Sequence, residues 1–203
     1  MARTPALIAV VITALSCASC TSMSAPSTSP PQTTSSATTG SSPVGSSATP
    51  TPTWSAQQTG AIAAVDAYRT ASQKIWSNPG GYSEDEMTAA LKTSAGPDVV
   101  SSNVGSYLDL KKRGLRIVGD TTVLTSSAGK ATDVGYATQV VVTLCIDQRQ
   151  LRAVDSSGTE VGADKLGYEL TDFNLREYTA QKRSADKAFR VYGIAPAKGV
   201  CGP

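Results

Sequence analysis

The sequence contains no histidine. This absence excludes Ser-His-Asp and Cys-His catalysis, imidazole general bases and metal sites built with histidine. Charge is also sparse, since 17% of the 203 residues are charged and the formal net charge is +2. So nearly neutral a chain lacks the basic surface that nucleic-acid binding needs. Glycine-rich phosphate loops, serine nucleophile elbows and carboxylate-rich metal loops are missing as well, so the sequence predicts no nucleic-acid partner, no cofactor and no metal.

Residues 1–20 have the pattern of an export signal. Arg3 supplies a positive charge, and an apolar run of ten residues extends from Ala6 to Leu15. A helix that spans a bilayer needs about 20 apolar residues, so this run fits the central part of a signal peptide instead.

Two cysteines, Cys17 and Cys20, follow the apolar run, each preceded by small residues. The string resembles a bacterial lipobox, in which a cysteine receives a diacylglycerol and becomes the mature N-terminus. The resemblance implies lipidation, palmitate included, at Cys17, with Cys20 as the alternative, although neither has the usual leucine three positions before it. Acyl chains contribute about 0.8 kcal/mol per buried methylene and would hold the protein on the outer face of the cell membrane. A secreted protein cut by ordinary signal peptidase is the other interpretation, because residues 14–16 form a small-x-small site.

Residues 21–53 carry no charge and include ten serines, nine threonines and six prolines. Such a composition cannot bury enough apolar surface to offset its ordering entropy, so the segment is predicted to be a disordered tether. The remaining 54–203 is long enough for one packed domain.

Hydrophobic periodicity in 54–203 predicts helices first and strands afterwards. The expected helices cover 54–77, 84–94 and 98–113; the expected strands cover 115–125, 134–146, 168–182 and 189–194. The segment 134–146 alternates, with one face holding Tyr136, Val140, Val142 and Leu144. This order predicts an α+β fold, with the N-terminal helices packed on one face of a curved antiparallel sheet.

Three short motifs add a family resemblance: Cys145-Ile146-Asp147, Phe189-Arg190-Val191 and Gly199-Val200-Cys201. In this order of elements they resemble actinobacterial lipoproteins with a nuclear transport factor 2-like cone domain, which is also the ketosteroid-isomerase fold. Phe189 departs from the tryptophan usual in that family. The resemblance implies a sheet curled into a cone whose mouth can bind an apolar small molecule.

Cys145 and Cys201 are the two cysteines of the 54–203 segment. Because an exported chain meets a non-reducing compartment, a disulfide between them is expected, and it would contribute about 4 kcal/mol by chain-entropy reasoning. A metal pair or a reactive thiol is the alternative, although two thiolates without histidine make a poor zinc site.

Tyr68, Tyr107 and Tyr136 are the candidates for lining a pocket. Some relatives of the cone family pair an aspartate base with a tyrosine donor. The further candidates for such a pair in this sequence are Tyr168, Asp109, Asp147 and Asp172. Asp147 shares the strand face of Cys145 and lies at the strand end, where a solvated carboxylate is ordinary.

The sequence therefore favours a lipid-anchored extracytoplasmic binding or scaffold module without catalytic activity. Its partners would be the membrane, through the N-terminal lipid, and an envelope protein or a small apolar ligand. One alternative is a small isomerase or dehydratase that uses an Asp–Tyr pair. Another is an envelope-exclusion or host-interaction lipoprotein, which needs only an anchor and a surface.

Overall fold

The computed structural model describes residues 53–202. The export signal, Cys17, Cys20 and all of the tether except Thr53 lie outside this part of the chain. Within it, no helix combines the length and the apolar character needed to cross a membrane.

The described chain begins with its helices. α1 (Ala56–Ser77) is followed by the 3-10 turn η1 (Pro79–Gly81), α2 (Glu84–Leu91) and α3 (Pro97–Lys112). α1 and α2 each start with a capping box, in which Ser55 and Ser83 accept hydrogen bonds from the backbone N–H groups of Gln58 and Glu86. These caps satisfy helix donors that would otherwise have no partner, and they fix where each helix begins.

Strands follow, and they form two antiparallel sheets. The larger sheet has the order β2-β4-β6-β7, with β3 beside β4; the smaller one joins β1 to β5. Their bounds are β1 (Arg116–Val118), β2 (Thr122–Ala128), β3 (Thr132–Asp133), β4 (Ala137–Asp147), β5 (Arg152–Val154), β6 (Phe173–Arg183) and β7 (Arg190–Pro196). β4 and β6 pair along their whole lengths, from Ala137 opposite Arg183 to Asp147 opposite Phe173.

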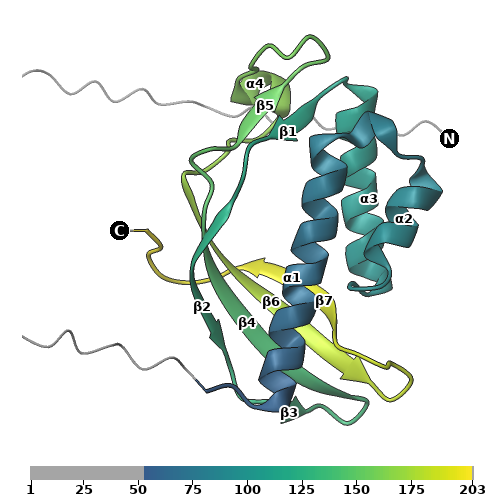
Figure 1. The fold of residues 1–203 in the computed structure, drawn as a ribbon, viewed down its shortest axis with the longest axis vertical. Helices are drawn as coiled ribbons and strands as arrows, with labels where there is room; N and C mark the ends of the chain where they lie inside the picture. Colours follow the sequence, from purple (N-terminus) through teal and green to yellow (C-terminus); the bar gives the residue numbers. More distant parts are fainter. Residues whose placement is uncertain (1–52, 203) are drawn as a thin grey trace, which may run out of the picture. The chain divides into compact units, whose positions relative to one another are not determined.

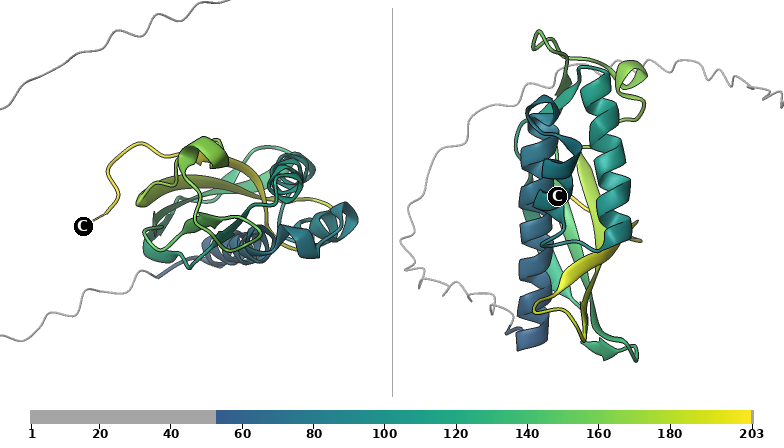
Figure 2. Two further views of the ribbon diagram at one scale, coloured as in Figure 1. Left: turned by 90° about the horizontal axis from the view of Figure 1, so that it is seen from above. Right: turned by 90° about the vertical axis from the view of Figure 1, so that its right-hand side faces the viewer.

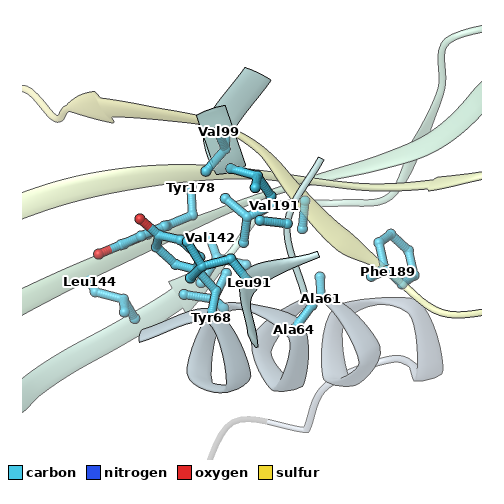
Figure 3. Packing of buried hydrophobic residues seen from close by; sticks show 14 of the residues in the cluster. Ala61, Ala64, Tyr68, Leu91, Val99, Val142, Leu144, Tyr178, Phe189 and Val191 are labelled. Atoms are coloured by element: carbon cyan, nitrogen blue, oxygen red, sulfur yellow. The ribbon is translucent and has the colours of Figure 1, made fainter. Parts of the chain in front are cut away.

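The larger sheet curves around α1, and α3 and α2 lie beside α1 on the same side (Figure 1). In Figure 2, α1 and α3 run next to each other in front of the strands. The core forms where α1 meets the inner face of β4, and Val65, Val140, Val142 and Leu144 are almost fully buried there. Figure 3 shows Ala61, Ala64 and Tyr68 of α1 on the side of the helix that faces Val142 and Val191, with Phe189 near Ala61 and Leu144 at the other end of the view. The α+β prediction, with helices on a curved antiparallel sheet, is confirmed.

Two elements differ from the sequence-based expectation. Residues 163–166, expected to lie in no element, form the short helix α4 (Ala163–Leu166), which Gly167 ends with a φ of 86°. The strand expected from residue 168 begins at Phe173 instead. Leu166 and Val161 pack with Leu115 and Leu151 in a second, smaller apolar cluster, so tertiary burial rather than strand pairing holds this segment.

The expectation that Tyr136 faces the core is wrong. Gly135 has a φ of 85°, which turns the backbone just before β4, so the inward–outward alternation starts only at Ala137. Tyr136 is 59% exposed, and the Arg183 guanidinium lies 5.6 Å from the centre of its ring. It therefore sits at the far end of the sheet from the cavity described below.

The expected disulfide between Cys145 and Cys201 is confirmed. Cys145 lies on the outer face of β4, between Leu144 and Ile146, whose side chains pack in the core. The link ties the C-terminal tail to the back of the sheet, where the Ala197 N–H also donates to the Leu175 carbonyl.

Candidate functional site

A cavity of about 420 Å³ lies between α1, α3, the inner face of the large sheet and the segment after α4. Its volume falls within the range of small-molecule sites. Surface hollows of about 660 and 560 Å³ also occur, but small and aliphatic side chains line most of both. The 420 Å³ cavity differs from them because tyrosine, arginine, asparagine, glutamine and serine side chains converge on it.

Tyr68 and Tyr107 line this cavity and share one acceptor. Their hydroxyls donate to Oδ1 of Asn103 over 3.0 and 3.3 Å. The Asn103 side chain is itself fixed, because its Nδ2 donates to the Val99 carbonyl one turn earlier, over 2.7 Å. Burial raises the pKa of Tyr68 and that of Tyr107. Both hydroxyls therefore stay protonated and act as donors.

α1 presents a stripe of three side chains to the cavity, Tyr68, Ser72 and Trp76, which follow one another every four residues. Ser72 is 4% exposed. Among the described residues, three buried side-chain polar atoms lack a well-aligned hydrogen-bond partner: Ser72 Oγ, Trp76 Nε1 and Gln181 Oε1. The first two line the cavity, and Ser72 Oγ lies near the Tyr68 and Tyr107 hydroxyls, where it opposes the rise in pKa that burial causes. A buried polar group left unpaired costs about 1–3 kcal/mol, so Trp76 Nε1 favours a molecule in the cavity that can accept a hydrogen bond from it.

Two arginines extend the polar lining. Arg69 of α1 donates from Nη2 to Thr121 Oγ1 over 3.0 Å, and its side chain is 18% exposed. Arg176 of β6 donates from Nε to Asn174 Oδ1 over 2.8 Å. Both hydrogen-bond partners are neutral, so neither contact cancels the arginine charge.

Sheet polar groups complete this side of the cavity. Asn174 Nδ2 donates to Gln148 Oε1 over 3.2 Å, and so does Thr171 Oγ1 over 3.5 Å. Tyr178 also lines the cavity, and its ring centre is 6.3 Å from that of Tyr68. Figure 3 shows the oxygen atoms of these two tyrosines on the same side. Burial raises the pKa of Tyr178, while the nearby charges of Arg69 and Arg176 oppose the rise.

The aspartates proposed for an Asp–Tyr pair lie elsewhere. Asp109 pairs with Arg113 over 3.0 Å, and Asp147 pairs with Arg149 over 2.7 Å. Hydrogen bonds from Arg149 lower the pKa of Asp147, so it stays ionised. Asp172 is exposed in the segment before β6. Of the four, only Tyr168 reaches the cavity, at its rim, where it is 50% exposed.

Several lining residues escape sequence reasoning: Arg69, Ser72, Trp76, Asn103, Gln148, Asn174 and Arg176. Ser72 and Trp76 belong to the α1 stripe, which hydrophobic periodicity assigns to an ordinary helix core. Arg176 could have been predicted from the sequence. It lies two residues before the buried Tyr178 on β6, and alternate residues of a strand point to the same face, so Arg176 faces inward. In residues 53–202 no three His, Cys, Asp or Glu side chains come together as a metal-binding group.

Comparisons with known proteins do not identify a family. No family model and no curated protein matches the chain. The solved structures that match include the intermembrane space region of the chloroplast protein ARC6. That structure has 12% identity and a TM-score of 0.46, and the match covers 73% of this chain and 100% of that chain.

Proposed function

We propose that this protein is a lipid-anchored extracytoplasmic module that binds a small molecule in the cavity between α1 and the sheet. The observation that carries the proposal is a buried, unpartnered donor, Trp76 Nε1, in a cavity of about 420 Å³ on which polar side chains converge. A cavity that served only as packing would be lined by apolar groups, as dry protein cavities are. Here the lining is polar and partly unsatisfied, which favours an occupant.

The proposal that the protein is lipid-anchored rests on the sequence of the export signal and its two cysteines. The proposal that the folded part is a cone domain rests on the motifs at 145–147, 189–191 and 199–201. Together they support a cone-domain lipoprotein of the actinobacterial type. The order of elements, three helices and then an antiparallel sheet curved around α1, suits a cone whose interior is reached from one end.

Replacing Cys17 with alanine tests the anchor. We expect the protein to move from the membrane fraction to the soluble fraction, because the acyl chains supply the membrane affinity at about 0.8 kcal/mol per buried methylene. Fractionation of cells that express the full chain measures this. Cys20→Ala is the matched control and should leave the protein at the membrane. Reversed results would assign the anchor to Cys20, and a protein that stays at the membrane in the double variant is not held by a lipid.

Native mass spectrometry of the protein gently extracted from its own membrane tests the cavity. We expect a small-molecule mass beyond the N-terminal acyl groups. Ser72→Leu should abolish that extra mass, because its larger side chain fills part of the cavity between Tyr68 and Trp76.

Ser184→Leu is the matched control for Ser72→Leu, since Ser184 is exposed in the turn between β6 and β7, outside the cavity lining. It should keep the extra mass. A wild-type protein that is bare, or that instead carries another envelope protein, would contradict ligand binding and move the function to the surface.

A further inference from the structure

We propose that the cavity ligand is an amphipathic monoanion, a carboxylate on an apolar body, with its charged group held by Arg69 and Arg176. This inference rests on the proposed binding function and names the class of molecule that the same cavity takes. Three features of the lining carry it: an excess of positive charge, a shortage of free acceptors and an apolar end.

The charge of the lining is positive. Arg69 and Arg176 both line the cavity, and Glu169 is its one carboxylate among the described residues. Glu169 is exposed at the rim, and the ion pairs of residues 53–202 join it to neither arginine. The acid beside Arg69 is Asp66, at 4.0 Å and with its side chain 58% exposed. Arg176 has no acid partner among the ion pairs of the described residues, and Arg69 has only this long pair with an exposed carboxylate. Partly buried arginines in this state favour an anion, because low dielectric strengthens their attraction for it.

Three of the four side-chain amide oxygens in the lining already accept hydrogen bonds. Asn103 Oδ1 already accepts from two tyrosines, Asn174 Oδ1 accepts from Arg176, and Gln148 Oε1 accepts from Asn174 and Thr171.

Several donors of the lining, in contrast, have no hydrogen-bond partner among the described residues. Each guanidinium has five N–H groups, and the hydrogen bonds above use one of those on Arg69 and one on Arg176. Trp76 Nε1 donates only, and it has no partner. A ligand that supplies acceptors complements these donors, and a carboxylate oxygen pair fits a guanidinium in bidentate fashion.

Titration does not reverse this pattern. Burial keeps the Tyr178 hydroxyl protonated beside the arginines, so it too remains a donor near neutral pH. A ligand with a cationic group would meet two guanidinium charges and is excluded by the same geometry.

The rest of the lining defines the body of the ligand. Ile117 of β1, Leu151 before β5 and Leu170 after α4 line the end of the cavity near the small sheet, next to the Trp76 ring. Ile117 and Leu151 are buried. This end suits an apolar or aromatic group, whose transfer from water is worth about 25 cal/mol per Å². The carboxylate therefore lies toward β6 and the apolar body toward β1 and β5.

A pair of probes that share one ring system tests the inference: 2-naphthoate, which is anionic, and 2-naphthylmethanol, which is neutral. Binding to the full-length protein in mild detergent is measured by equilibrium dialysis, with micelles alone correcting for partition. We expect 2-naphthoate to bind about tenfold more tightly or better, as hydrogen bonds to charged groups imply. Arg69→Gln and Arg176→Gln should each weaken 2-naphthoate about tenfold and leave 2-naphthylmethanol within about twofold.

Arg116→Gln is the matched control, because Arg116 is exposed on β1 and does not line the cavity. It should leave both affinities unchanged, and Arg176→Lys should retain part of the preference for the anion. Equal binding of the two probes, equal weakening of both by the arginine variants, or binding of neither would overturn the inference. The proposed function would then still be judged separately, by the extra mass on the extracted wild-type protein.

Discussion

Replacing Cys145 and Cys201 together with alanine is expected to lower the free energy of unfolding by about 4 kcal/mol. The two residues are 56 positions apart, and opening the link lets the unfolded chain regain the conformational freedom of that loop. The melting temperature of a domain this size should fall by about 8–16 °C. Urea unfolding of the full chain, followed by tryptophan fluorescence, measures the difference.

The wild-type protein treated with a reductant provides the control for this variant. It should lose about the same stability, whereas the double-alanine variant should not respond to the reductant. Ligand binding should survive in both, because neither cysteine lines the cavity. A loss below about 1 kcal/mol would mean that the unfolded chain is already compact around this loop.

Replacing Gly119 with alanine should cost about 3 kcal/mol or more, since it combines a backbone penalty with a steric one. Gly119 has a φ of 99°, a conformation that side chains disfavour. A Cβ there would also lie 2.0 Å from the Gln150 carbonyl oxygen. The close approach lets the chain pass from β1 to β2 beside the segment that precedes β5. The variant should separate these segments and weaken probe binding, because Ile117 and Leu151 line the cavity there.

Gly158→Ala separates the two contributions. Gly158 has a φ of 86°, but no atom lies within 4 Å of a Cβ placed on it. This control should lose only the backbone part, about 1–2 kcal/mol, and should keep its affinity for the probes. Chemical denaturation of both variants gives the comparison, and equal losses would contradict the steric argument at Gly119.

The sequence predicts most of the fold because its local signals agree with one another. Capping serines start α1 and α2, Gly114 with a φ of 66° follows α3, and the alternation of Val140, Val142 and Leu144 identifies the inner face of β4. Each of these signals acts over a few residues. Where tertiary contacts decide instead, prediction fails, as at α4, whose four residues are fixed by burial of Leu166 in the smaller cluster.

The cavity lining is harder to predict from the sequence, because tertiary packing rather than local sequence brings its residues together. Tyr68 and Tyr107 are found as aromatic members of apolar stripes, but Tyr136 is misplaced because a turn at Gly135 interrupts the strand pattern. Ser72 occupies a position where a core helix tolerates a small residue, so nothing local marks its hydroxyl as part of the cavity lining. Arg69 and Arg176 are more than a hundred residues apart, and only the packing of α1 against β6 brings both to one cavity.

The direction of α1 has a consequence for where the cavity lies in the domain. Ala56, at the first turn, lies at the end of the domain that carries β3 and the β6–β7 turn (Figure 1). The cavity residues Tyr68 to Trp76 follow about 18–30 Å further along the helix, at a rise of about 1.5 Å per residue. The cavity therefore lies toward the C-terminal end of α1, away from the end of the domain at which this helix begins.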